Sequence, residues 1–270
     1  MQLGIVTYMI AARWSVDRII EVLEMVGMRG VELRSGHRHG VEDRLDATQR
    51  QRVRQLFERS NVELVGLGTA FEFDAPDAAV VRRNVEGAKR YVELAHDVGA
   101  YGIKVRPNRL HIDRGIPAAR TIAQIAAALQ ELGEYGVGFG VKIRVEVHGR
   151  GTSQIPVMQQ IMQRVGHPNV VVCWNSNPTD LDSPKAAAGH GTIRGNFARL
   201  KRWIEIVHIH DLYDERYPYR ELFGLLAEAG FDGYTLAEIP ACRCDEDAVR
   251  VLRYYRALWE QLRGQAAGER

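Results

Sequence analysis

The sequence has few cysteines and no long apolar segment. Its three cysteines, Cys173, Cys242 and Cys244, form an odd and sparse set, which argues against a disulfide framework or a structural zinc site. No apolar run approaches the roughly 18 residues that a transmembrane helix needs, so we expect no membrane span. The segment Met1–Val6 has no basic lead and suits a first strand better than a signal peptide, so we expect a cytoplasmic protein.

The chain also lacks a strong charge of either sign. Its 36 basic and 34 acidic residues give a net charge of +2, which is too balanced to indicate a nucleic-acid or membrane partner. No Gly-x-Gly-x-x-Gly turn follows the first apolar run, which disfavours a dinucleotide-binding fold. No linker rich in Pro, Gly or Ser interrupts the chain, so residues 1–270 are expected to form a single domain.

What is present is an alternation of two kinds of segment. Short runs rich in Val and Ile are typical of buried parallel strands, and longer stretches with helical spacing separate them. The expected strands are Leu3–Thr7, Gly30–Leu33, Val62–Leu67, Tyr101–Val105, Val141–Val147, Val170–Cys173, Ile204–Ile209 and Tyr234–Glu238. The expected helices are Ser15–Val26, Ala47–Arg59, Ala78–Val98, Pro117–Tyr135, Gln154–Val165, Thr192–Arg202, Tyr219–Ala229 and Asp245–Arg263. Eight strand–helix units in this length predict a closed (β/α)₈ TIM barrel rather than an open sheet.

Glycines mark the expected ends of several helices. A glycine tolerates the left-handed backbone conformation that commonly ends a helix. The glycines in such positions are Gly27, Gly99, Gly136, Gly166 and Gly230.

Polar side chains stand at the carboxyl ends of the expected strands, where the active sites of such barrels lie. Glu146 ends the fifth strand, His208 lies near the end of the seventh, and Glu238 ends the eighth. Taken singly, a strand histidine is usually a core residue, and a glutamate would pair with an arginine. Together the three predict a mixed oxygen and nitrogen site for one divalent metal, Mn²⁺, Mg²⁺, Co²⁺ or Zn²⁺.

Further polar residues near the same strand ends are candidates for binding a substrate. Glu32 is expected at the mouth of the barrel near the second strand, and Lys104 and Arg106 on the fourth strand could contact a hydroxyl or a carboxylate. Arg216 follows the seventh strand, where an anionic group could dock. For each of these residues the alternative is a structural or solvated role.

At these strand ends the sequence resembles the xylose-isomerase-like barrel superfamily, and within it the sugar phosphate isomerase/epimerase group. The resemblance covers nearly the whole chain. The segments that carry it are Gly30–Arg34, Glu146–Gly149, Val172–Asn175, Val207–Asp211 and Tyr234–Glu238. The His-x-x-Asp pattern of the seventh strand and the Glu of the eighth are fairly specific together, and each alone is weak.

The resemblance implies a set of four metal ligands: Glu146, Asn175, His208 and Glu238. Asn175 departs from the family pattern, which has Asp at this position. An amide oxygen can still ligate a divalent ion, but it brings no charge. The metal affinity is therefore expected to be weaker than with three carboxylates.

The resemblance also implies a chemical scheme. The metal would chelate the substrate carbonyl and an adjacent hydroxyl, and its charge would stabilise the developing enediolate. Glu146 and Glu238 would remove and return the proton. His148 would orient a hydroxyl, unless it makes only a structural hydrogen bond, and His210 stands where the family often has Lys or Asn.

Four functions follow from this reading. The first is a metal-dependent isomerase or epimerase of a small sugar or keto-polyol, and the second is a lyase or dehydratase of a keto-sugar or keto-inositol. A non-catalytic sugar-binding barrel is the third, because Asn175 replaces Asp. An endonuclease acting on abasic DNA is disfavoured by the near-neutral charge and the missing Asp. We expect a small sugar or polyol as partner, no nucleic acid and no membrane. Barrels of this superfamily often form homo-oligomers, but the sequence does not fix an oligomeric state.

Overall fold

The computed structural model describes residues 1–181 and 193–268. Eight parallel strands follow one another around a closed barrel, and the last pairs with the first, which confirms the predicted (β/α)₈ architecture. The strands are β1 (Gln2–Val6), β2 (Gly30–Arg34), β3 (Glu63–Glu72), β4 (Gly102–Arg106), β5 (Lys142–Glu146), β6 (Val170–Asn175), β7 (Ile204–Ile209) and β8 (Tyr234–Ala237).

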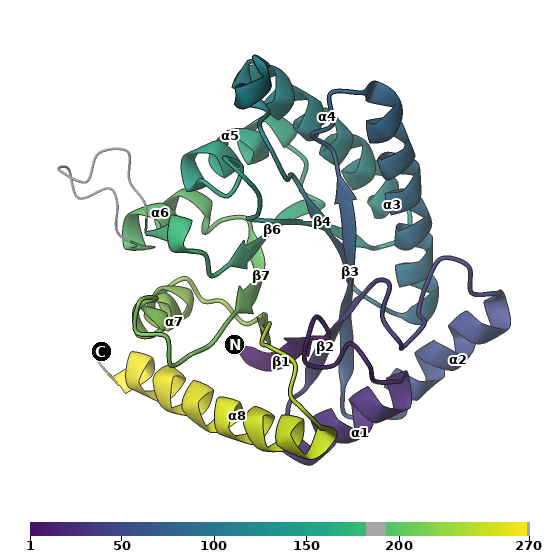
Figure 1. The fold of residues 1–270 in the computed structure, drawn as a ribbon, viewed down its shortest axis with the longest axis vertical. Helices are drawn as coiled ribbons and strands as arrows, with labels where there is room; N and C mark the ends of the chain where they lie inside the picture. Colours follow the sequence, from purple (N-terminus) through teal and green to yellow (C-terminus); the bar gives the residue numbers. More distant parts are fainter. Residues whose placement is uncertain (182–192, 269–270) are drawn as a thin grey trace.

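The helices form a ring outside the strands (Figure 1). They are α1 (Val16–Val26), α2 (Ala47–Glu58), α3 (Ala78–Val98), α4 (Ala118–Val137), α5 (Ile155–Val165), α6 (Ile193–Leu200), α7 (Tyr219–Glu228) and α8 (Asp245–Gly268). Two 3₁₀ turns, η1 (Ile112–Arg114) and η2 (Pro178–Asp180), lie in loops. Thr192, the expected start of the sixth helix, lies outside the described residues.

The third strand is longer than predicted, since it continues past Leu67 to Glu72. The small residues after Leu67 break the apolar run that the prediction followed. The extension is held to β4, because Thr69 donates a 2.6 Å hydrogen bond to the carbonyl of Lys104 and Glu72 pairs with Arg106.

Glycines cap helices as predicted in three cases. Gly230, with φ +70°, directly follows Ala229, the capping residue of α7, and Gly136 is an exception. Gly27, Gly99 and Gly166 cap α1, α3 and α5 in the left-handed conformation. Gly136 instead lies inside α4, which ends at Val137. A Cβ at Gly136 would lie 2.4 Å from the carbonyl oxygen of Val141, so this glycine allows close packing and does not end the helix.

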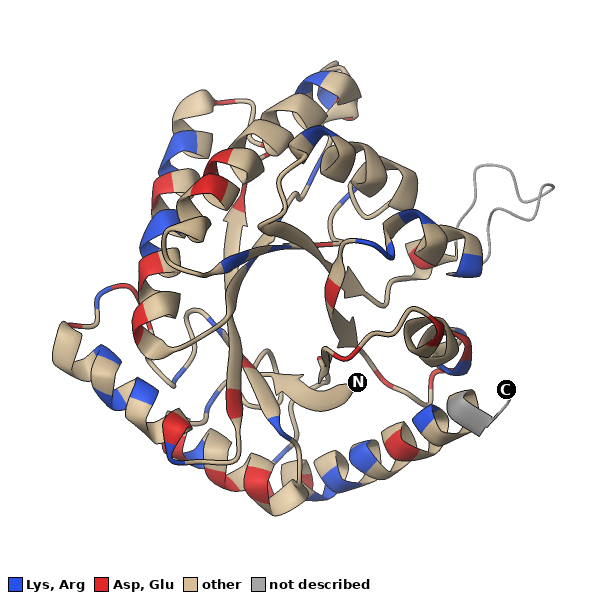
Figure 2. Ribbon diagram, turned by 180° about the vertical axis from the view of Figure 1, so that it is seen from behind, with Lys and Arg blue, Asp and Glu red and all other residues tan. Residues whose placement is uncertain are grey.

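The main core lies between the strands and the surrounding helices. Branched strand residues such as Ile5, Ile103 and Val145 are fully buried there against helix residues such as Leu129. Basic and acidic residues are interspersed along the outer helices (Figure 2). In the described part of the chain, no helix is long and apolar enough to cross a membrane.

Because all strands run parallel, their carboxyl ends meet at one end of the barrel. Side chains two apart on a strand share a face, so Glu32 and Arg34 both point to the interior, as do Lys104 and Arg106. The barrel therefore gathers polar side chains from different strands into one place.

Candidate metal and substrate site

Three potential metal ligands converge at the carboxyl ends of β5, β7 and β8. Glu146 is the last residue of β5, His208 lies on β7, and Glu238 directly follows β8. One potential ligand atom from each residue lies within 4.8 Å of the others. The structure thus brings together the three residues that the sequence placed at one centre.

The imidazole of His208 lies among three carboxylates. Its Nδ1 is 3.2 Å from Oε2 of Glu238 and 3.8 Å from Oε1 of Glu146, and its Nε2 is 3.5 Å from Oε1 of Glu32. Burial opposes protonation, but the neighbouring groups, Glu32 among them, raise the pKa of His208 well above its usual value. Neither ring nitrogen makes a hydrogen bond to any described residue, although the ring is buried.

Glu146 is held on both of its oxygens. Lys104 donates a 2.6 Å hydrogen bond to Oε2, and the amide nitrogen of Asn175 donates a 3.1 Å bond to Oε1. Burial alone would raise the pKa of Glu146, but the Lys104 ammonium and His208 lower it to about 2. Glu238 is more open than Glu146. Burial would raise its pKa as well, but the nearby imidazole of His208 lowers it.

The donor set fits a divalent cation. Glu32, Glu146 and Glu238 bring three carboxylates into the interior, while Lys104 supplies one fixed positive charge. An imidazole nitrogen without a partner faces two of these carboxylates. Buried carboxylates are costly when positive charge does not balance them. A dication bound by one imidazole and two carboxylates would supply that positive charge.

Asn175 ends β6 beside this cluster, with its amide nitrogen toward Glu146. Its Oδ1 accepts a 2.9 Å hydrogen bond from Nε2 of His210, whose Nδ1 lies 3.2 Å from the carbonyl oxygen of Glu238. The oxygen that would ligate a metal is therefore engaged by His210. A half-turn of the amide would exchange its nitrogen and oxygen and direct the oxygen toward the cluster.

The cluster forms the floor of a cavity of about 340 Å³. Its walls combine residues expected at the site with residues that were not singled out. The lining residues are Val6, Tyr8, Arg34, Lys104, Arg106, Glu146, His148, Asn175, Asn177, His208, His210 and Glu238. Sequence reasoning did not single out Tyr8, Arg34 and Asn177. Arg34 lies two residues after Glu32 on the same strand, and this spacing could have indicated that its side chain faces the cavity.

Two candidates lie elsewhere than expected. Glu32 is fully buried below the cavity and does not line the mouth, because glycines at positions 66 and 68 of β3 leave room for its carboxylate inside the barrel. Arg216 is bound to Asp214 by a 2.7 Å ion pair with its side chain 90% exposed, and it is absent from the cavity wall.

A close contact between two loops fixes the position of His148. Gly149 has φ +96°, and a Cβ there would lie 1.6 Å from the carbonyl oxygen of Asn108. Thr152 links both segments, since its hydroxyl lies 2.7 Å from the carbonyl oxygens of Asn108 and His148. His148 is thereby held against the cavity, where burial lowers its pKa.

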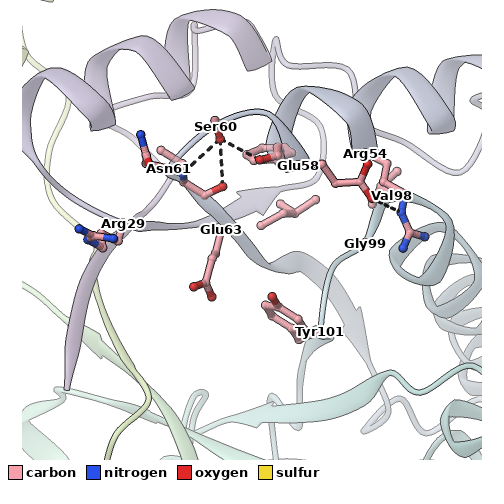
Figure 3. Close-up of a pocket in the computed structure, with 12 residues that line it drawn as sticks. Arg29, Arg54, Glu58, Ser60, Asn61, Glu63, Val98, Gly99 and Tyr101 are labelled. Atoms are coloured by element: carbon pink, nitrogen blue, oxygen red, sulfur yellow. Dashed lines mark hydrogen bonds and ion pairs between the residues drawn. The ribbon is translucent and has the colours of Figure 1, made fainter.

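A second hollow lies at the opposite end of the barrel (Figure 3). It is bordered by the segments that precede β2, β3 and β4, and its volume is about 460 Å³. Arg54 and Glu58 on its rim form an ion pair with each other, and Ser60 bonds to backbone carbonyls. It lies at the amino ends of these strands, far along the barrel from the metal-ligand cluster.

Comparisons with known proteins agree with this fold. D-psicose 3-epimerase with D-tagatose from Clostridium cellulolyticum H10 superposes with a TM-score of 0.78 at 14% identity, over 98% of this chain and 99% of that chain. The IolI protein with a bound zinc atom gives 0.77 at 16% identity, over 98% and 99%. The probable 3-DHS dehydratase AsbF from Bacillus anthracis gives 0.69 at 12% identity, over 95% and 99%.

No curated protein matches the chain. The sequence pattern of one protein family, the xylose isomerase-like TIM barrel, matches residues 20–258. This match spans most of the sequence and all but the first strand of the barrel. The chain therefore belongs to the xylose isomerase-like TIM barrel family.

Proposed function

We propose that this protein is a divalent-metal-dependent isomerase or epimerase of a small sugar or keto-polyol. The observation that carries the proposal is the cluster of Glu146, His208 and Glu238 on the floor of a polar cavity at the carboxyl ends of the strands. Carboxylates beside a bound carbonyl compound suit proton transfer at the carbon next to the carbonyl.

Glu146, His208 and Glu238 would hold the metal, with Asn175 as a fourth ligand after its amide turns. A bound dication supplies positive charge that polarises a substrate carbonyl and stabilises an enediolate. His208 would bind through Nδ1, the nitrogen that faces Glu146 and Glu238, which leaves Nε2 directed toward Glu32.

Glu146 and Glu238 would transfer the proton, and their different surroundings suit them to different roles. Glu146 is anchored by Lys104 and Asn175 on its two oxygens, whereas the side chain of Glu238 is 16% exposed. We assign removal of the substrate proton to Glu238, which is freer to approach it. Glu146, whose Oε2 accepts a hydrogen bond from the Lys104 ammonium, would pass a proton from Lys104 to the opposite face or to the neighbouring carbon.

The walls of the cavity would hold the substrate. His148 and His210 stand on two sides of the cluster, and Arg106 ends β4 beside Lys104. Each offers a nitrogen that can bond to a hydroxyl of a sugar. Two of the structurally similar proteins, the D-psicose 3-epimerase and the IolI protein with zinc, support a sugar substrate and a metal respectively.

A dehydratase is the second candidate, and the similarity to the probable 3-DHS dehydratase favours it. Loss of water from a keto-sugar begins with the same removal of a proton next to a carbonyl. The same residues would therefore serve either outcome.

Solvent exchange tests the proposal. The purified protein is incubated with Mn²⁺ in D₂O with a panel of ketoses and keto-inositols, and deuterium next to the carbonyl is followed by NMR. We expect incorporation into at least one compound and its loss in Glu238→Gln. Incorporation that survives Glu238→Gln or Glu146→Gln would refute the assigned bases, and no incorporation across the panel would contradict the proposed activity.

A further inference from the structure

We infer that the substrate carries an anionic group, such as a carboxylate, which binds to Arg34 at the rim of the metal cavity. This inference rests on the proposed function, because it names the class of substrate for the same site. The observations behind it are the charges that line the cavity and the partners that each of them has.

Two of the three cationic side chains of the cavity are already paired. Lys104 donates to Glu146, and Arg106 donates a 2.5 Å hydrogen bond to Glu72. The carboxylates that line the cavity are Glu146 and Glu238, and both would be bound to the metal.

Arg34 is the cation that remains. Its Nη1 bonds to the carbonyl and hydroxyl oxygens of Ser35, both at 2.8 Å, and among residues 1–181 and 193–268 it has no carboxylate partner and no bond from Nε or Nη2. Glu42, on the loop that follows, bonds to Tyr91 and to the backbone N–H of Gly36. Asp43 pairs with Arg90 and Asp46 caps α2, so the acids of this loop are engaged away from Arg34.

The position of Arg34 is built into the fold. Its backbone N–H bonds to the hydroxyl of Thr7, and its carbonyl lies 2.8 Å from Nε2 of His39. On the other side of the cavity, the buried Nε of Arg106 has no hydrogen-bond partner in the described chain. Guanidinium N–H groups without partners, on side chains that line one cavity, are suited to a planar carboxylate.

The charge balance leads to the same conclusion. A dication would be neutralised by Glu146 and Glu238. The buried carboxylate of Glu32 would then offset Lys104, and Glu72 offsets Arg106. One guanidinium charge would then be left at the mouth, where it attracts an anion of a single charge. A neutral sugar would leave this charge without a counterpart.

The test compares matched ligands by calorimetry, with and without Mn²⁺. The probes are D-fructose, D-psicose, D-tagatose and D-sorbose, the same four ketoses with a carboxylate at C6, and their 6-phosphates. We expect at least one charged ketose to bind about tenfold or more tightly than its neutral counterpart, with the preference declining as salt is added. The carboxylate and phosphate series show which anion is favoured.

Variants of Arg34 test whether this residue binds the anionic group. Arg34→Gln should abolish the preference for the anion, and Arg34→Lys should restore part of it. Arg52→Gln, which changes an exposed arginine of α2 outside the barrel, should leave the preference unchanged. The inference is overturned if no charged ketose binds more tightly than its neutral partner, or if the preference survives in Arg34→Gln. Since the preference is read from binding affinity and not from deuterium exchange, this failure is distinct from an absence of exchange.

Discussion

Lys104 and Glu146 form an ion pair inside the barrel, with Nζ 2.6 Å from Oε2 and side chains that are 7% and 5% exposed. Removing one partner of a buried pair leaves an uncompensated charge, whereas the net contribution of the pair itself is small. Lys104 therefore stabilises the free protein chiefly by neutralising a carboxylate of the proposed metal site.

We expect Lys104→Met to lower the free energy of unfolding by about 3–5 kcal/mol in the absence of metal. Combining it with Glu146→Gln should recover much of this loss, because the buried charge is then gone. Lys89→Met is the control, since Lys89 pairs with Glu131 near the surface and its loss should cost about 1 kcal/mol or less. Urea unfolding of the four proteins provides the measurement. Equal losses for Lys104→Met and Lys89→Met would argue against a buried charge at Glu146.

Glu32 is expected to orient His208 without contacting the metal. Its carboxylate lies 3.5 Å from Nε2 of His208, on the side of the ring away from Glu238. Loss of such an outer partner typically costs about 10–100-fold in metal affinity. Glu32→Gln should therefore weaken Mn²⁺ binding by this amount in a calorimetric titration, while Glu134→Gln, at an exposed site on α4, should not. An unchanged affinity in Glu32→Gln would mean that Glu32 does not position the ligand.

Replacing Asn175 by Asp should affect the free and metal-bound protein in opposite directions. The new carboxylate would face Glu146, to which the amide now donates a hydrogen bond, so the metal-free protein should be less stable. With a divalent ion the added charge should tighten binding by about tenfold or more. Thermal unfolding with and without Mn²⁺ measures both effects. If the affinity for Mn²⁺ stays the same, Asn175 is not a ligand.

His39 should make stability depend on pH. Burial lowers its pKa, and its Nδ1 accepts a 3.0 Å hydrogen bond from the backbone N–H of Val41, which requires the neutral ring. The unfolded chain binds a proton at about 6.5. It therefore binds more protons than the folded chain below that pH, and stability falls as the solution is acidified.

The comparison with His39→Gln isolates this effect. The parent should lose stability relative to the variant as the pH falls through about 6.5, and the difference between them should be constant at higher pH. Urea unfolding at a series of pH values gives the two curves. Parallel curves through this range would show that the pKa of His39 is not lowered in the folded protein.

The sequence predicted the barrel well because each strand carries its own apolar run and the polar residues fall at strand ends. It placed Glu146, His208 and Glu238 together on this basis, and the structure brings their ligand atoms within 4.8 Å. It could not place Glu32 below the site, because the space for that carboxylate depends on glycines of a neighbouring strand.

Other parts of the site depended on contacts that a linear sequence does not contain. Arg216 was expected near the substrate because it follows the seventh strand, but its side chain pairs locally with Asp214 and extends into solvent. Arg34 was overlooked, although its spacing from Glu32 places both side chains on the same face of the strand. Its importance appears only when the partners of Lys104 and Arg106 are known.

A titration with Mn²⁺, followed by electron paramagnetic resonance of the free ion, tests the central claim most directly. The parent protein should bind one ion per chain, and both His208→Ala and Glu238→Gln should weaken that binding by at least about a hundredfold. His167→Ala should serve as the control, because His167 lies at the opposite end of the barrel, before β6. Absence of Mn²⁺ binding by the parent, or binding that is unchanged in His208→Ala, would contradict a metal centre at Glu146, His208 and Glu238.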